Sequence, residues 1–391
     1  MPDSPKITHP LLRLGRLPLG PDLRGLAPGS AESGLVATAT VTVPDSPTSR
    51  SYAWDVAWAD AVREASQLGA DPATAEALEA SASSIVAGGG AQVVVAAHGM
   101  GMLAWRLLSA PAATSVRVGP LPHLQEAADA AARRPAYVVV LADRDGTDIV
   151  MHAAGDQVPA RRFEVGDRPG LQPDPHPDRP PAQHHGERHL TDREPESGGE
   201  RNDEFIAGRV AAAADSVGAH VVLGAGDQHI LDAIGSHLPE TIGPVTVIAG
   251  QRPADGLDDH LGAEISAALD EIANAVIGAV ADLVASRAEG PDPGAVRGLK
   301  AVAEQLAEQQ VAVLLVAADV ARDADAGSTY RIGSRPTEFL VDDDTGVEVP
   351  LEDGLVWAAL HQDAIVVQLP DRTGPLAGES VAALLRRGVA G

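Results

Sequence analysis

The residues from 151 to 200 concentrate side chains that could bind a metal ion or a phosphate group. They include five of the thirteen histidines, six arginines, ten acids and eight prolines, with hardly any large apolar residue. The run HHGERH at 184–189 could supply imidazole ligands to a metal, because histidine is the commonest metal ligand. Alternatively, its basic groups could contact RNA phosphates, or the histidines could simply be polar residues of an exposed segment.

A pair of glycines follows this run, in ESGGERNDEF at 196–205. Gly198 and Gly199 precede Glu200, and adjacent glycines let a backbone approach a partner closely. The stretch could therefore be the tip of a functional loop. It could equally be a flexible entry to a helix, with Ser197 or Asn202 as the cap.

A third motif, GAGD at 224–227, resembles a phosphate-binding turn between a strand and a helix. It lacks the third glycine and the Lys and Ser residues of such loops, so we interpret it as a tight turn. Neither a Ser-His-Asp arrangement nor a P-loop stands out elsewhere in the sequence.

Composition limits the partners of the 391-residue chain. Its 29 basic and 55 acidic residues give a formal net charge of -26, which on average repels nucleic acid and membranes. Lys6 and Lys300 are the only lysines, so any RNA contact needs a local cluster of arginines. The chain has no cysteine, which excludes disulfides, thiolate nucleophiles and Cys-based metal sites. It also lacks an apolar run of about 18 residues, so we expect no membrane partner and a soluble, cytoplasmic protein.

Alternating helical and strand patterns predict an α/β fold with mixed sheets covered by helices. After an irregular arm at 1–32, we expect three domains, at 33–128, 129–288 and 289–391. The elements that carry this prediction are a strand at 34–43, helices at 52–69 and 71–90, a hairpin at 133–155 with a DG turn, a long loop at 156–204, a helix at 205–219, a strand at 220–226, a long helix at 261–288, and a closing helix at 376–388.

In the order of its elements, the second domain resembles the middle domain of the archaeal and eukaryotic class I release factor and Pelota family. The resemblance covers about residues 33–391 and is greatest to the bacterial branch, which includes dormancy-associated homologues of actinobacteria and the hibernation factor Balon. It implies a three-domain, Pelota-like architecture. The segments that carry it are AYVVVLADRDGTDIVMHAAGDQVPARRFEV, ESGGERNDEF, VAAAADSVGAHVVLGAG and VRGLKAVAEQLAEQQVAVLLVAADV.

The resemblance implies that the partner is the ribosome, through its A site and the rRNA of both subunits. Elongation factor Tu or another translational GTPase is a candidate second partner, and we expect no DNA partner, cofactor or metal. The first domain would reach the decoding centre through two turns, with the candidates Ser46, Thr48, Arg50, His98 and Met100. The loop of the second domain would contact RNA at the peptidyl-transferase centre, with the candidates Arg161, Arg162, Arg168, Arg179, His184, His185, Arg188, His189, Gly198, Gly199 and Glu200.

Active members of the family carry Gly-Gly-Gln, where this chain has Glu200 after its two glycines. An ionised glutamate cannot donate a hydrogen bond, so we assign no catalytic residue and expect a ribosome hibernation factor that blocks both centres without releasing peptide. An alternative is a peptidyl-tRNA or tRNA hydrolase of ribosome rescue, which would use Glu200 or a loop histidine. A third is an α/β protein unrelated to the ribosome, which the acidic charge favours.

Overall fold

The chain folds into two compact units. The first consists of residues 1–135, 154–157 and 269–391, and the second of residues 136–153 and 158–268. The regions predicted as first and third domains therefore share one unit. The computed structural model describes residues 23–27, 34–43, 50–80, 90–97, 101–107, 114–144, 146–155, 161–166, 196–251, 259–288, 293–318, 320, 329–339 and 346–389.

An antiparallel sheet begins the first unit, with the strand order β3-β2-β1-β4. Because side chains alternate along a strand, Ala37, Ala39 and Val41 of β1 share one face, and they pack with Trp58 and Leu78. The indole of Trp58 donates to the carbonyl of Leu78 at 3.0 Å. The elements are β1 (Val36–Val43), β2 (Gly90–Ala97), β3 (Gly101–Leu107), β4 (Ser115–Gly119), α2 (Arg50–Gln67) and α3 (Pro72–Ala80), after the short η1 (Arg24–Leu26).

The second sheet of this unit is mixed, with the order β10-β15-β11-β14. The predicted closing helix is wrong, because Val381–Leu385 form β15, which pairs with both β10 and β11. All five residues of β15 are buried, and a strand buried on both faces shows no polar alternation that would distinguish it from a helix. The other strands are β10 (Ala295–Arg297), β11 (Val311–Ala317) and β14 (Ile365–Leu369).

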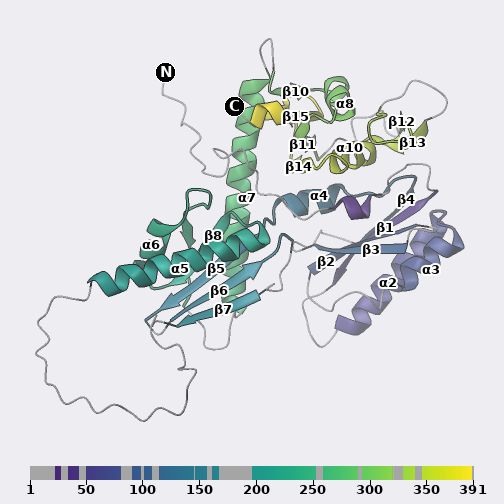
Figure 1. The fold of residues 1–391 in the computed structure, drawn as a ribbon. Helices are drawn as coiled ribbons and strands as arrows, with labels where there is room; N and C mark the ends of the chain where they lie inside the picture. Colours follow the sequence, from purple (N-terminus) through teal and green to yellow (C-terminus); the bar gives the residue numbers. More distant parts are fainter. Residues whose placement is uncertain are drawn as a thin grey trace, which may run out of the picture. The chain divides into compact units, whose positions relative to one another are not determined.

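Helices cover both faces of this mixed sheet (Figure 1). α10 is buried along its whole length, and α4 packs on the edge strand β14. Asp129 of α4 accepts the N–H of Gln368 in β14 at 2.8 Å, so its carboxylate occupies a donor of the sheet edge. The elements are α4 (Gln125–Ala132), α8 (Leu299–Ala307) and α10 (Leu351–Leu360) on one face and α7 (Asp259–Arg287) on the other, with the pair β12 (Thr329–Ile332) and β13 (Val347–Pro350), then η3 (Gly374–Leu376) and α11 (Arg386–Val389).

The second unit contains a five-stranded sheet in the order β7-β6-β5-β8-β9. The predicted hairpin is confirmed, since β5 and β6 are antiparallel and the N–H of Gly146 donates to Asp143 at 2.9 Å in the turn. β8 runs parallel to β5 and to β9, and α5 and α6 pack against each other beside the sheet. The elements are β5 (Tyr137–Asp143), β6 (Gly146–His152), β7 (Arg161–Gly166), α5 (Glu196–Val217), β8 (Val221–Gly226), α6 (Gln228–His237) and β9 (Val245–Val247).

Both units combine sheets with covering helices, and parallel and antiparallel pairs occur in the same sheets. The predicted α/β class with mixed, helix-covered sheets is confirmed. Within the described ranges, no helix has both the length and the hydropathy needed to cross a lipid bilayer.

One buried amide joins three elements of the first unit. Oε1 of Gln362 accepts the N–H of Val311 at 3.0 Å, next to the point where the pairing of β11 with β15 shifts register. Its Nε2 donates to the carbonyls of Leu306 and Ala358 at 3.3 and 3.1 Å. The residue is 8% exposed, so water has little access to replace these bonds.

We expect Gln362→Ala to lower the free energy of unfolding by about 1–3 kcal/mol, because the buried N–H of Val311 loses its acceptor. The control is Gln310→Ala, which removes a single bond, from the side chain to the carbonyl of Glu308, and should change stability by no more than about 0.5 kcal/mol. Urea denaturation of both variants measures the difference. An equal decrease in the free energy of unfolding of the two variants would show that the buried amide of Gln362 stabilises the fold no more than the side chain of Gln310 does.

Candidate functional site

The predicted peptidyl-transferase loop is described only at its root in the second unit. On one side, β7 extends the sheet from Arg161 to Gly166, and on the other, α5 begins at Glu196. The segment predicted as a loop at 156–204 thus contains a strand and the first turns of a helix. That helix begins nine residues earlier than the predicted start at Phe205.

Gly198, Gly199 and Glu200 lie inside α5 and not at a loop tip, which corrects the first of the two interpretations of this stretch. Ser197 and Asn202 also lie inside the helix, so neither is its N-terminal cap. Acids at a helix N-terminus interact favourably with the helix dipole, and the alanines that follow are strong helix formers. Together they outweigh the cost of two helical glycines, about 1 kcal/mol each.

The other predicted contact residues are only partly visible. Arg161 and Arg162 lie in β7, and Arg50 is the first residue of α2. Of the residues predicted to contact the ribosome, Arg162 is the one whose side chain the structure describes. The predictions that lie outside the described residues are Ser46, Thr48, His98, Met100, Arg168, Arg179, His184, His185, Arg188 and His189.

Arg162 forms an ion pair with a buried carboxylate. Its Nη2 lies 2.8 Å from Oδ2 of Asp148 in the neighbouring strand β6. The side chain of Asp148 is 1% exposed and that of Arg162 is 41% exposed. The guanidinium therefore compensates a charge that would be costly to bury alone, while its five N–H donors leave some free for a phosphate. In the sequence, the signal for this pair is the position of Asp148 next to the apolar residues of the strand GTDIVMH.

The first histidine of the His-rich segment belongs to the core. His152 in β6 lies opposite Tyr137 in β5, and the two rings stack with centroids 4.3 Å apart and planes 5° from parallel. The two residues are 1% and 6% exposed, respectively. His152 is therefore part of the packing of the second unit and presents no surface to RNA.

The GAGD motif forms the tight junction between β8 and α6 that was predicted, and its two glycines are also required by packing. A Cβ on Gly226, whose φ is +116°, would lie 1.9 Å from the carbonyl oxygen of Ala142. A Cβ on Gly224 would lie 2.7 Å from a methyl of Val245. The carboxylate of Asp227 accepts the N–H of His229 at 3.0 Å and caps α6. The end of α6 that could have bound a phosphate is thus occupied by the protein's own anion.

A cluster of ionisable residues between β4 and α10 in the first unit, buried except for Arg117, was not predicted. Nδ1 of His123 is hydrogen-bonded to Oδ1 of Asp353 at 2.7 Å. Nη1 of Arg117 lies 3.5 Å from Oε1 of Glu352. The backbone N–H of His123 donates to Oγ1 of Thr38 in β1 at 3.0 Å, which ties the turn before α4 to the N-terminal sheet.

His123, Glu352 and Asp353 offer ligand atoms within 4.8 Å of one another among the described residues. These groups are already engaged, however, because the imidazole contacts one carboxylate and Arg117 faces the other. A guanidinium beside a carboxylate opposes the approach of a second cation. The geometry is that of an ion pair beside a hydrogen-bonded His–Asp pair. Burial raises the pKa of Asp353 above its ordinary 3.8, and the hydrogen bond with His123 opposes this shift.

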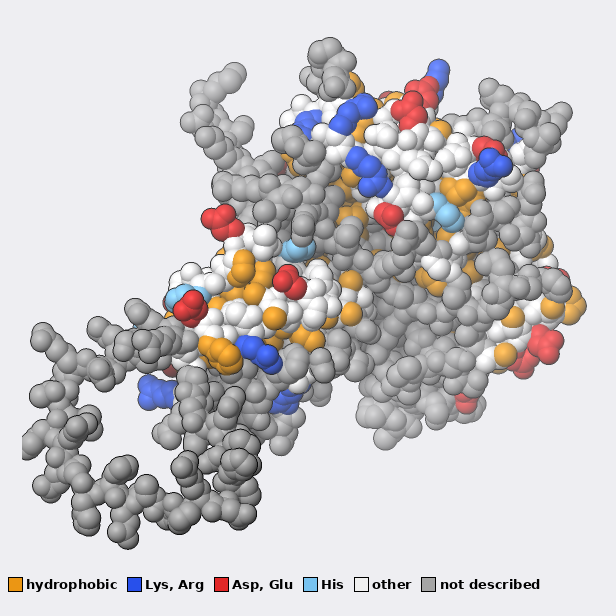
Figure 2. Space-filling model, viewed as in Figure 1, with side chains coloured by type: hydrophobic (Ala, Val, Ile, Leu, Met, Phe, Trp, Pro, Cys, Tyr) orange, Lys and Arg blue, Asp and Glu red, His pale blue; other side chains and the backbone are white. Residues whose placement is uncertain are grey.

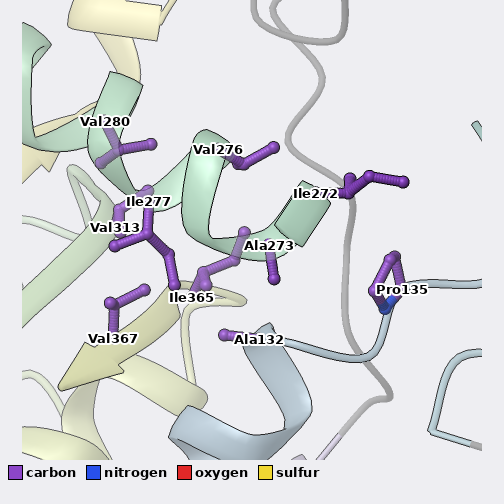
Figure 3. Close-up of a pocket in the computed structure, with 10 residues that line it drawn as sticks. All are labelled: Ala132, Pro135, Ile272, Ala273, Val276, Ile277, Val280, Val313, Ile365 and Val367. Atoms are coloured by element: carbon purple, nitrogen blue, oxygen red, sulfur yellow. The ribbon is translucent and has the colours of Figure 1, made fainter. Parts of the chain in front are cut away.

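An apolar pocket lies in the first unit where the end of α4 meets α7 and the mixed sheet (Figure 3). Its ten described lining residues are all Ala, Pro, Ile or Val, among them Ala132, Ile272, Val276 and Ile365. A substrate site needs a few convergent polar groups to orient its ligand, and this lining supplies none from its side chains. The pocket therefore does not indicate catalysis.

Comparison with known proteins supports the family resemblance over the middle of the chain. Residues 136–289 match the model of bacterial archaeo-eukaryotic release factor family 2. This segment is therefore release-factor-like, as its element order predicted. No curated protein is similar enough in sequence to match the chain.

Several solved structures are similar to the chain at low sequence identity. Pelota of Archaeoglobus fulgidus is 16% identical, with 76% of this chain and 79% of that chain covered and a TM-score of 0.34. An archaeal Pelota in a ribosome-bound model with ABCE1 is 14% identical, with 75% and 77% covered and a TM-score of 0.37. Dom34 of S. cerevisiae is 9% identical, with 76% and 79% covered and a TM-score of 0.34.

We expect Gly226→Ala to destabilise the protein by about 3 kcal/mol or more, because the new Cβ both clashes with Ala142 and strains the backbone. The matched control is Gly208→Ala, on the exposed side of α5, where an added Cβ meets nothing within 4 Å. That variant should gain about 0.5–1 kcal/mol from helix propensity. Thermal denaturation measures both effects, and a tolerated Gly226→Ala would contradict the packing role of this turn.

Proposed function

We propose that this chain binds the vacant A site of idle or stressed ribosomes and blocks the decoding and peptidyl-transferase centres without catalysing peptide release. The observation that carries the proposal is the match of residues 136–289 to a release factor family. It favours a role in translation over that of an unrelated α/β protein. Three features of the second unit favour binding without chemistry.

The first feature is the residue that follows the two glycines. By the resemblance to release factors, Glu200 takes the place of the glutamine of active relatives, and its ionised side chain can only accept hydrogen bonds. An acid at this position would also be repelled by rRNA phosphates. Both effects oppose the placement of a water molecule against a peptidyl-tRNA ester.

The second feature is the helical start of α5 at Glu196. With Gly198 and Gly199 inside the helix, their carbonyls accept helical hydrogen bonds and their backbone is held in the helical conformation. A loop tip would instead leave them free to approach the substrate closely. Their helical state therefore supports occupancy over catalysis.

The third feature is that three described polar residues of the second unit have structural roles. Asp148 is paired with Arg162, His152 stacks on Tyr137, and Asp227 caps α6. Each has a structural role that the contacts explain. None of the three is presented as an acid or base to a bound substrate.

RNA binding by so acidic a chain requires local contacts. On the face in Figure 2, the described Lys and Arg side chains occur singly or in small groups among acidic ones. The arginines that we predict to contact RNA lie close together in the segment that matches the release factor family, at positions 161, 162, 168, 179 and 188. The chain has a net charge of -26, so a few guanidinium groups would have to supply its attraction to rRNA phosphates. Binding of this kind should be sensitive to salt.

We expect the protein to comigrate with ribosomes from stationary or stressed cells at low salt and to be lost at high salt. Replacing Arg168, Arg179 and Arg188 with Gln should reduce the slope of log affinity against log salt by about 2 to 3, one phosphate contact each. The matched control replaces Arg63, Arg144 and Arg335, which lie elsewhere on the surface. Failure to comigrate at any salt concentration would refute the proposal.

The alternative is a peptidyl-tRNA or tRNA hydrolase of ribosome rescue, which the release factor family favours. Ribosomes loaded with labelled peptidyl-tRNA distinguish the two functions. We expect no release of peptide, and the same background rate for Glu200→Ala. Release that depends on Glu200 would instead establish the hydrolase.

A further inference from the structure

The mixed sheet of the first unit carries two arginines that no acid compensates. Elsewhere, exposed arginines of this unit pair with carboxylates, as Arg63 does with Asp60 and Arg331 with Glu348. Within the described ranges, the guanidinium groups of Arg297 and Arg386 instead bind only backbone carbonyls. The chain has 55 acids for 29 bases, so this arrangement runs against its overall excess of negative charge.

Arg386 is held by the carbonyls of two residues that follow helices. It is the exposed first residue of α11, and its Nε donates to the carbonyl of Gln309 at 3.3 Å, while Nη2 donates to that of Gln362. One role of the side chain is therefore to close the ends of α8 and α10. A carbonyl carries only a partial charge, and three of the five N–H donors remain for another partner. The group is a cation with a fixed orientation.

Arg297 in β10 is held in the same way. Its Nε donates to the carbonyl of Pro375 at 2.8 Å, and its Nη2 donates to that of Ala285 in α7 at 3.3 Å. In the sheet it lies opposite Ala382 of β15. Four residues at about 3.3 Å each separate Ala382 from Arg386, so the two arginines start about 13 Å apart along the sheet. They are thus placed to contact two separate anionic groups.

A third arginine extends the group. Arg387 is exposed beside Arg386, and its Nε donates to the carbonyl of Pro293, just before β10, at 3.2 Å. We call Arg297, Arg386 and Arg387 the C-terminal basic patch. Figure 2 shows basic side chains lying close together over the region where β10, β15 and α11 are drawn in Figure 1.

The acids near this patch are directed elsewhere. The carboxylate of Glu308 accepts the side-chain amide of Gln305 at 3.0 Å. Oε2 of Glu379 lies beside Gly298, 3.3 Å from the position that a Cβ on this glycine would take. Neither acid forms an ion pair with Arg297 or Arg386. The local field of the patch is therefore positive on a chain whose net charge is -26.

We propose that the C-terminal basic patch binds RNA through its phosphate groups, as a contact surface separate from the loop of the second unit. A guanidinium fork of fixed orientation matches two phosphate oxygens, and oriented forks at a separation of about 13 Å suit successive parts of one RNA backbone. The choice of RNA as the anion rests on the proposed function. The positive charge of the patch does not.

A labelled RNA hairpin, titrated with the full chain between about 50 and 200 mM salt, tests the patch directly. Arg297→Gln combined with Arg386→Gln should lower the slope of log affinity against log salt by about 2, one phosphate contact each. The loss of affinity over this range then becomes about tenfold smaller than for the unaltered chain. The matched control replaces Arg63 and Arg331, which already pair with acids, and should leave the slope unchanged.

A second variant keeps every bond of the patch. Gln309→Glu with Ala285→Glu places a carboxylate beside each guanidinium at exposed positions, and the carbonyls that hold Arg386 and Arg297 remain. We expect hairpin binding to weaken about tenfold or more at about 100 mM salt, because the new acids take the place of the phosphates.

Three outcomes would overturn the inference: no binding of the hairpin at low salt, the same slope in the unaltered chain and the Arg297 and Arg386 variant, or tighter binding to polyglutamate than to RNA. The last would assign the patch to an acidic protein partner. Cosedimentation of the same variants with ribosomes separates this inference from the proposed function. Hairpin binding that depends on the patch, without any binding to ribosomes, would remove the A-site proposal and leave the patch as an RNA site.

Discussion

The arrangement of the second unit depends on the close approach of two backbones at Gly226. The carbonyl of Ala142 in β5 occupies the space that a side chain on Gly226 would need, and the same oxygen accepts the N–H of Asp227 at 2.8 Å. This contact fixes the parallel pairing of β8 with β5. Because α5 leads directly into β8, it also fixes the direction in which the helix leaves the sheet.

Two side-chain pairs of the second unit also serve its architecture. The ion pair of Arg162 with Asp148 joins β7 to β6, and the rings of His152 and Tyr137 join β6 to β5. Each of these residue types could have done chemistry. Their neighbours assign them to holding the strands of this sheet together.

Local sequence patterns predicted the elements whose signals are local. β1, the hairpin of β5 and β6, and the long α7 follow from β-branched residues, a DG turn and a helical period. β15 was predicted as a helix because VAALL is apolar on both faces. The pair of His123 and Asp353 could not be predicted, since 230 residues separate its members and only the tertiary fold brings them together.

The side chain of Asp129 has an effect beyond the molecule itself. β14 is an edge strand, and an edge strand with free N–H groups can recruit a strand from another molecule. Here a carboxylate from α4 already occupies the N–H of Gln368, with Arg133 bound to its other oxygen at 2.9 Å. A foreign strand would have to displace a charged, paired group before it could add to the sheet. This edge is thereby protected against the intermolecular β-pairing that begins aggregation.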